Sequence, residues 1–224
     1  MTTTIAPSSS VDQRVVLHDI SWETYESLLR ELEGQQLRLT YDRGELEIMT
    51  PSPRHGKIGL LIARLIETYT LELHVPLVGL SNTTWRRESL EKGIEADECY
   101  YLANATWAAG REEFDLDVDP PPDLAIEVDI SRSSLDKQSI YAALGVPELW
   151  RYEDDQLSIV QLDTQGHYQP SQASPSLPHL PPKVIERFVR LRTSGKTDTE
   201  IIAAFVEWIH EQPGHDRSSS SPSP

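Results

Sequence analysis

Residues 122–130, with the sequence PDLAIEVDI, constrain the fold of this chain more than any other segment. The run is almost continuously apolar, which is typical of a central strand that other elements cover on both faces. It also contains Glu127 and Asp129, which lie two positions apart and therefore on the same face of a strand. A carboxylate in such a place is costly unless it is paired, protonated or bound to a metal. The segment therefore predicts a buried strand with acidic side chains on one face.

Helical and strand patterns account for most of the remaining chain. Apolar residues at helical spacing predict helices at residues 22–32, 53–69, 134–144, 183–194 and 198–211. Alternating or continuous apolar runs predict further strands at residues 37–41, 46–48, 75–85, 94–102, 148–153 and 156–162. Ser21, Ser52 and the pair Thr197 and Glu200 are typical helix N-caps, and Gly145 closes the helix predicted at 134–144. This order predicts an α/β (α+β) fold, with helices flanking a mixed sheet and a helix–hairpin extension at the N-terminal end.

Composition divides the chain into five parts. Residues 13–165 carry the patterns of the main domain, and residues 183–212 carry a C-terminal helical extension. Pro-rich residues 166–182 are expected to link them. Residues 1–12 and 213–224 hold too little apolar surface to offset the entropy of ordering them, and both are expected to be disordered.

The sequence points to a cytoplasmic protein. Cys99 is the single cysteine, which excludes an intrachain disulfide and a cysteine-based zinc site. The chain start has no basic region followed by an apolar run, so no signal peptide is expected. No apolar stretch approaches the roughly 20 residues that span a bilayer, so no membrane association is expected.

The charge of the chain argues against strong non-specific attraction to nucleic acid. The formal net charge is −16 at pH 7, whereas affinity for nucleic acid comes largely from neutralising phosphates. A local basic patch can still dominate the field near a site. Residues 183–196 hold five basic residues against one acidic residue and form the clearest such patch, while Arg86 and Arg87 could belong to a phosphate track. Scattered surface charge is an equally good interpretation of these residues.

Asp97 and Glu127 are the leading candidates for a functional pair. Asp97 lies in the middle of the strand predicted at 94–102, so two neighbouring strands would bring the carboxylates together across the strand spacing of roughly 5 Å. Carboxylate oxygens are the ligands that Mg²⁺ prefers, and waters and a substrate phosphate can complete its octahedron. Asp129 lies roughly 6.6 Å further along the same strand face. Asp123 has the same parity but is expected only to start the strand.

A resemblance to a known family rests on two stretches. The first is residues 122–152, PDLAIEVDISRSSLDKQSIYAALGVPELWRY, and the second, earlier in the chain, is residues 44–56, GELEIMTPSPRHG. Both closely resemble small bacterial proteins of the "Putative restriction endonuclease" family, formerly a domain of unknown function. That family is a branch of the PD-(D/E)XK nuclease superfamily. The resemblance covers about residues 20–165 and is most specific in the first of the two stretches. It implies a restriction-endonuclease-like fold.

The resemblance also assigns roles to individual residues. Asp97 takes the place of the motif aspartate, although Ala96 precedes it where the motif has proline, and Glu127 takes the place of the second acidic residue. Asp129 stands where the motif lysine would be. In this branch the following helix supplies a lysine in a K-x-x-x-Y pattern, which here is Lys137 with Tyr141.

The implied activity is Mg²⁺- or Mn²⁺-dependent hydrolysis of phosphodiester bonds in nucleic acid, with DNA the expected substrate. The implied catalytic residues are Asp97, Glu127 and Lys137, and Asp129 joins the first two as a metal ligand. Lys137 would orient the attacking water or offset developing negative charge. A homodimer would suit this activity, because cutting a duplex needs two sites and two-fold pairing is common.

Residues near the second helix are weaker candidates. Arg54, His55 and Lys57 lie at its predicted start and could contact a substrate phosphate, although a histidine there is more often a cap or packing residue. Glu45 and Glu47 share one face of the predicted hairpin and are expected to be its solvent-exposed side.

Two other functions compete with the nuclease hypothesis. The aspartate at position 129 and the acidic net charge favour an inactive relative that keeps the fold as a binding or regulatory module. A glycosidase would need two carboxyls facing a sugar-sized cleft, and the sequence shows no aromatic platform for a sugar.

Overall fold

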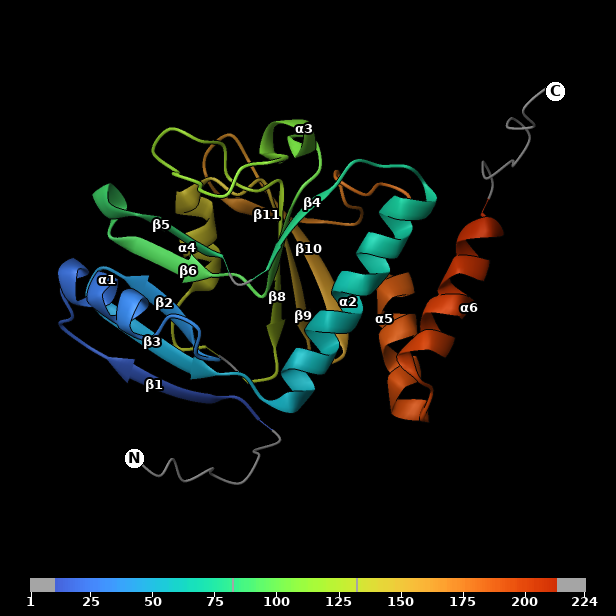
Figure 1. The fold of residues 1–224 in the computed structure, drawn as a ribbon, viewed down its shortest axis with the longest axis horizontal. Helices are drawn as coiled ribbons and strands as arrows, with labels where there is room; N and C mark the ends of the chain where they lie inside the picture. Colours follow the sequence, from blue (N-terminus) through green and yellow to red (C-terminus); the bar gives the residue numbers. More distant parts are fainter. Residues whose placement is uncertain (1–10, 82, 132, 213–224) are drawn as a thin grey trace.

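The computed structural model describes residues 11–81, 83–131 and 133–212 of the chain. In this part of the chain the strands form two sheets, shown in Figure 1. The five-stranded sheet, called the small sheet, contains in spatial order β1 (Gln13–Leu17), β3 (Glu45–Thr50), β2 (Arg38–Asp42), β6 (Lys92–Glu95) and β5 (Thr84–Arg87). All of its pairs are antiparallel.

The six-stranded sheet, called the large sheet, positions the acidic residues singled out in the sequence. Its strands are, in spatial order, β11 (Tyr168–Ser171), β10 (Gln156–Leu162), β9 (Glu148–Glu153), β8 (Leu124–Asp129), β7 (Glu98–Tyr101) and β4 (Val78–Ser81). β8 and β9 are parallel and the other pairs are antiparallel, so this sheet is mixed. All residues of β8 are buried, as the apolar sequence predicted.

Helices cover both sheets, and the predicted fold class is confirmed. The helices are α1 (Trp22–Glu31), α2 (Pro53–Glu72), α3 (Ala105–Ala108), α4 (Lys137–Leu144), α5 (Pro182–Leu191) and α6 (Asp198–His210). Short 3₁₀ turns lie at Glu88–Leu90 and Arg192–Ser194. Within the described ranges, none of the helices has the length and apolar character needed to cross a bilayer.

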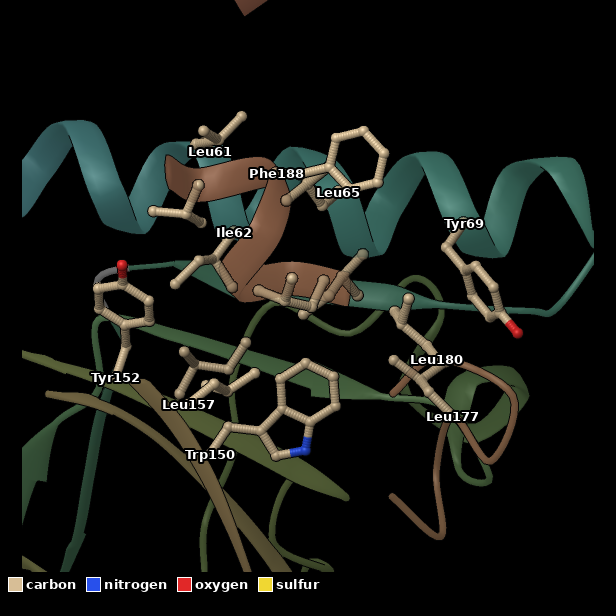
Figure 2. Packing of buried hydrophobic residues seen from close by; sticks show 14 of the residues in the cluster. Leu61, Ile62, Leu65, Tyr69, Trp150, Tyr152, Leu157, Leu177, Leu180 and Phe188 are labelled. Atoms are coloured by element: carbon tan, nitrogen blue, oxygen red, sulfur yellow. The ribbon is translucent and has the colours of Figure 1, made fainter. Parts of the chain in front are cut away.

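One face of the large sheet packs against α2 and α5, and α6 packs on these two helices. Figure 2 shows Trp150 and Tyr152 from β9 and Leu157 from β10 facing the apolar side of α2, with Phe188 of α5 close by. Burying a large apolar side chain is worth about 1.5–3 kcal/mol, so this layer is a main source of stability. The C-terminal helices belong to the same core as the sheet, because Phe188 and Phe205 are members of that cluster.

The opposite face of the large sheet packs against α4, which also contacts β6 and β5 of the small sheet. Ile140, Tyr141 and Leu144 of α4 share one buried cluster with Trp85 and Ile94, which come from the small sheet. Helix α4 therefore lies in the angle between the two sheets. The cluster joins the sheets into one body around this helix, and α1 covers the small sheet through a separate core.

Local sequence signals explain where the helices begin. Ser21 accepts a hydrogen bond from Thr24 N, and Ser52 accepts one from His55 N, as predicted for N-caps. The predicted capping box of Thr197 and Glu200 is present at the start of α6. These caps satisfy backbone donors that the first helical turn leaves free.

The structure differs from the sequence prediction in several strands. The strand predicted at 94–102 is divided into β6 and β7, which belong to different sheets, and the segment 75–85 likewise contains β4 and β5. β1 was not predicted, and β11 lies inside the segment 166–182 that was expected to be a linker. The domain division itself stays a prediction, and residues 1–10 and 213–224, expected to be disordered, lie outside the described part of the chain.

Candidate functional site

The alternation of β8 decides which of its side chains face α4. Ile126 and Val128 belong to the cluster under α2, whereas Ala125 belongs to the cluster around α4. Glu127 and Asp129 have the parity of Ala125 and therefore point toward α4. The two acidic residues thus lie on the face of the large sheet that carries Lys137.

Glu127 is held by two side chains of α4. It is 1% exposed, and its carboxylate accepts hydrogen bonds from the Lys137 ammonium and from the Tyr141 hydroxyl. Both donors come from one helix face because they are four residues apart. Burial raises the pKa of Glu127, and the nearby charges of Asp97 and Asp129 add to this despite the Lys137 ammonium.

Lys137 is a buried cation surrounded by carboxylates. Its Nζ lies 3.9 Å from Asp129 Oδ1 in addition to its contact with Glu127. Burial would lower the pKa of Lys137, but the charges of Glu127, Asp97 and Asp129 raise it to about 12. The side chain is therefore an ammonium at neutral pH and is suited to offset negative charge.

Asp129 joins the site from the end of β8. Its Oδ2 accepts a hydrogen bond from Arg151 Nη2 at 3.0 Å, whereas its buried Oδ1 has no hydrogen-bond partner. Asp129, Lys137 and Arg151 line a cavity of about 400 Å³. An unsatisfied buried carboxylate oxygen beside a cavity is an available ligand for a cation.

Asp97 reaches the site from the junction between the sheets rather than from the middle of a strand, which corrects the sequence prediction. The β7–β8 register pairs Glu98 with Ile126, so Asp97 is the next residue outward, opposite Glu127. Asp97 Oδ2 accepts a hydrogen bond from Val128 N at 2.8 Å. The side chain is thereby fixed against the strand that carries Glu127.

His55 is buried between two carboxylates. Its Nε2 lies 2.8 Å from Asp97 Oδ1 and its Nδ1 lies 3.2 Å from Asp12 Oδ2. Burial would lower the pKa of His55, but the two carboxylates raise it to about 9. The same imidazolium lowers the pKa of Asp97, against the effect of its burial. Asp12, at the edge of the range expected to be disordered, also accepts a hydrogen bond from Ser52 N at the start of α2.

The other residues predicted to contact substrate lie at the surface. Arg54 is exposed and its Nη2 lies 3.3 Å from Asp155 Oδ1. Lys57 is exposed as well, and its backbone oxygen accepts a hydrogen bond from Arg192. Asp123, expected only to start the strand, binds Leu102 N and the Asn104 side chain.

A cavity of about 980 Å³ lies on the other side of Asp97, between α1, the small sheet and the start of α2. We call this cavity the groove. Arg38 and His55 line it and also approach Asp97, at 3.6 Å and 2.8 Å. Arg30 and Arg86 line it as well, together with leucine side chains and three glutamates. The groove therefore combines cationic and apolar surface beside the candidate site.

Sequence reasoning missed two buried acidic residues in this region, Asp12 and Glu47. Glu47 was expected on the solvent side of a hairpin, but it is 1% exposed. The reason is tertiary, because the segment after β8 covers this face of the small sheet, and Ser133 and Ser134 bind the Glu47 carboxylate. The alternation of Leu46 and Ile48 indicated the face but contained no sign of what covers it.

The carboxylates of the site can be compared with the ligands that a divalent cation needs. Among the described residues, no three His, Cys, Asp or Glu side chains converge as a preformed metal cluster. Mg²⁺ needs less, because it commonly takes one or two carboxylates together with waters. Asp97, Glu127 and Asp129 provide such oxygens, and Asp129 Oδ1 is buried without a hydrogen-bond donor. These residues therefore fit a hard divalent ion.

The fold and the site define a class of protein. The large sheet is mixed, its acidic residues lie where β7 and β8 meet, and the following helix supplies a lysine. This arrangement is that of a PD-(D/E)XK-like, restriction-endonuclease-like protein. The chain belongs to the family described as "Putative restriction endonuclease" (Uma2), whose model matches residues 22–194. No curated protein matches the chain.

Proposed function

We propose that this protein is a Mg²⁺- or Mn²⁺-dependent endonuclease that hydrolyses phosphodiester bonds of nucleic acid, with DNA as the expected substrate. The observation that carries the proposal is the set of three buried carboxylates, from Asp97, Glu127 and Asp129, around the Lys137 ammonium. A cytoplasmic homodimer, with one site for each strand of a duplex, belongs to the same proposal.

Each residue has a distinct part in the proposed reaction. Asp97 and Glu127 would hold the divalent ion, with Asp129 as a further ligand. When bound, such an ion lowers the pKa of a coordinated water and polarises a phosphoryl oxygen. Lys137, freed in part from Glu127, would then balance the negative charge that develops on the phosphate. The cavity lined by Asp129, Lys137 and Arg151 gives a phosphate access to these groups.

The residues around α2 support this centre. His55 has both ring nitrogens directed at carboxylates, so we propose that it orients Asp97. Arg54 and Lys57 are exposed at the start of α2 and remain candidates for contact with phosphates. A helix N-terminus adds favourable backbone donors for an anion.

An alternative function is favoured by the ion pairs within the site. Lys137 already binds Glu127, and Arg151 already binds Asp129, so local cations offset part of the charge without a metal. A catalytically inactive, nuclease-fold binding or regulatory module would keep these pairs. The two functions differ in whether the carboxylates bind a divalent ion.

The test is cleavage of labelled single-stranded, duplex and branched DNA and of RNA, with Mg²⁺ or Mn²⁺ and with chelator. The nuclease proposal expects metal-dependent cleavage that falls on the order of 100-fold or more in Glu127→Gln and in Lys137→Gln, because each loses a charge that acts on the transition state. Asp123→Asn is the matched control, since Asp123 immediately precedes β8 and contacts residues outside the site.

Calorimetric titration with Mg²⁺ or Mn²⁺ separates the two functions independently of substrate choice. The nuclease proposal expects binding by the wild type and by Asp123→Asn and its loss in Glu127→Gln. Identical absence of heat in all three proteins, with no cleavage of any substrate, would favour the inactive module.

A further inference from the structure

The buried carboxylate of Glu47 makes contacts that the proposed reaction does not use. Its oxygens accept hydrogen bonds from Arg14 Nη1 at 2.6 Å and from Ser133 Oγ at 3.0 Å. They also accept from Ser134 N at 3.2 Å and from Ser134 Oγ at 3.3 Å. A buried carboxylate is stable only with such compensation, so Glu47 binds the segment after β8 to the small sheet.

Arg14 reaches the same segment from β1. Its Nε donates to Ser131 Oγ at 3.1 Å and its Nη2 donates to Ser131 O at 3.0 Å, while Nη1 is held by Glu47. Asp12 lies 3.7 Å from Nη2. A planar guanidinium with several fixed donors is suited to hold two partners at once. Arg14 therefore connects Glu47, Ser131 and the carboxylate that binds His55.

These contacts lead along the chain to Lys137. Ser131, Ser133 and Ser134 lie between Asp129, at the end of β8, and Lys137, at the start of α4. Ser133 Oγ, which donates to Glu47, accepts a hydrogen bond from Leu135 N at 3.1 Å. Leu135 O in turn accepts one from Lys137 N at 3.0 Å. A continuous series of hydrogen bonds thus runs from Glu47 to the backbone of the lysine.

We propose that Arg14 and Glu47, here called the clamp, are positioning residues. They fix Ser131, Ser133 and Ser134 between β8 and α4 and so set the place of the Lys137 ammonium against Glu127. The catalytic part of this inference rests on the proposed nuclease function. Arg14 precedes residue 22, where the family match begins, so β1 contributes to the site from outside the matched region. Misplacement of a reacting group by about 1 Å can cost on the order of 100-fold in rate.

The first experiment measures the position of Lys137 without any assay of activity. Metal-free protein is labelled with a limiting amount of an amine-reactive reagent, and the labelling rates of individual lysines are compared by mass spectrometry. Lys92 is the internal reference, because Lys92 and Lys137 are both 8% exposed and Lys92 pairs with Asp42 away from the site. Variants are Glu47→Gln, Glu47→Ala and Arg14→Lys, with Glu45→Gln as the control, since Glu45 is on the same strand and pairs with exposed His18.

The clamp predicts a graded and local effect. Lys137 labelling should rise in Glu47→Gln, which keeps one carbonyl acceptor, and rise further in Glu47→Ala, while Lys92 labelling stays at its wild-type rate. Arg14→Lys should give an intermediate rise, because one cationic nitrogen replaces the three guanidinium nitrogens that donate to Glu47 and Ser131, and Glu45→Gln should match the wild type. Unchanged Lys137 labelling in Glu47→Gln and Arg14→Lys would overturn the proposal, as would an equal rise at Lys92, which indicates general loosening of the fold.

The second experiment applies once cleavage by the wild type is found. Glu47→Gln is then expected to lower kcat on the order of 10- to 100-fold while KM stays within about twofold, because the clamp acts on positioning rather than on substrate affinity. A rise in KM at constant kcat would contradict the clamp. If the wild type cleaves no substrate, the proposed nuclease function is contradicted. The labelling experiment then tests the clamp by itself.

Discussion

Buried carboxylates at the meeting point of the two sheets set the electrostatics of this molecule at the residue scale. Asp12, Glu47, Asp97, Glu127 and Asp129 are all among the buried charged residues. Each is compensated by a nearby cation or by hydrogen-bond donors. Removing one partner of a buried ion pair typically costs about 3–5 kcal/mol, because the remaining charge is left without compensation. Variants at these positions therefore report on stability as well as on chemistry.

The protonation of His55 gives a prediction at this scale. In metal-free protein its pKa should be near 9, raised from the ordinary 6.5 by Asp12 and Asp97 against the effect of burial. Because the pKa is raised in the folded state, the stabilisation is fully present below about pH 6.5 and is lost as the pH rises through 9. Titration of the His55 ring signal by NMR measures the pKa, and Asp12→Asn should lower it.

The exposed residue His18 is the control for this titration. Asp12→Asn should leave the His18 signal unchanged, since His18 pairs with Glu45. A His55 pKa at its ordinary value in the wild type would contradict the buried network around Asp97.

The sequence allowed some of these residues to be predicted and not others. Glu127 stood out because its neighbours in the chain are apolar, and Lys137 was found through the family resemblance. Glu47 and Arg14 could not be recognised, because strand alternation indicates which face a side chain lies on but not which distant segment covers that face. Their partners Ser131 and Ser133 are more than 80 positions away in the chain.

At the scale of elements, the division of two predicted strands is what brings the site together. Residues 94–102 look like one strand because their local pattern is extended throughout, but the chain passes from the small sheet to the large sheet between Glu95 and Glu98. Asp97 lies at this crossing. Helices α1, α2 and α6, by contrast, were predicted to within a few residues, because their caps and their apolar spacing are local signals. The short helix α3 lies in a segment that was expected to be a loop, and α4 begins at Lys137 rather than at residue 134. Sheet membership depends on long-range pairing and is not a local property.

Gly93 provides a prediction about how α1 packs on the small sheet. A Cβ at this position of β6 would lie 2.8 Å from Cζ of Tyr25, whose ring is fully buried and stacked on Tyr41. Gly93→Ala should therefore destabilise the protein by about 1–3 kcal/mol, as other overpacked cores are destabilised. Unfolding in urea measures the change.

Gly56→Ala is the matched control, because a Cβ on this residue of α2 meets no atom within 4 Å. It should be neutral or stabilising by up to about 1 kcal/mol, the helix preference for alanine. Equal stability of Gly93→Ala and the wild type would show that Tyr25 does not pack closely on β6.

At the scale of the whole molecule, the acidic charge limits how nucleic acid can bind. A chain with a net charge of −16 repels a polyanion over most of its surface, so binding must depend on a few local cations. Three of the five basic residues of segment 183–196 have an acidic partner within the chain, since Lys183 and Arg190 pair with Glu186 and Arg192 pairs with Asp198. The groove beside Asp97 is the better candidate for a substrate strand.

Two adjacent arginines allow a test of the groove. Arg86 lines it, whereas Arg87 binds Leu116 O and approaches Asp117 outside it. In a Glu127→Gln background, Arg86→Gln should weaken binding of short labelled single-stranded DNA and lower the slope of log affinity against log salt by about 0.7. Arg87→Gln should change neither quantity in fluorescence anisotropy. Equal effects of the two substitutions would show that the groove does not contact the strand.

The hydrogen bond from Val128 N to Asp97 Oδ2 gives Asp97 a structural role that does not depend on its charge. The carboxylate occupies the place of a backbone acceptor just beyond the last β7–β8 pair. Asp97→Asn would retain an oxygen for Val128 N and lose the charge, whereas Asp97→Ala would leave that amide buried without a partner. Lineages that abandon cleavage but still need the fold should therefore accumulate asparagine at this position far more readily than alanine.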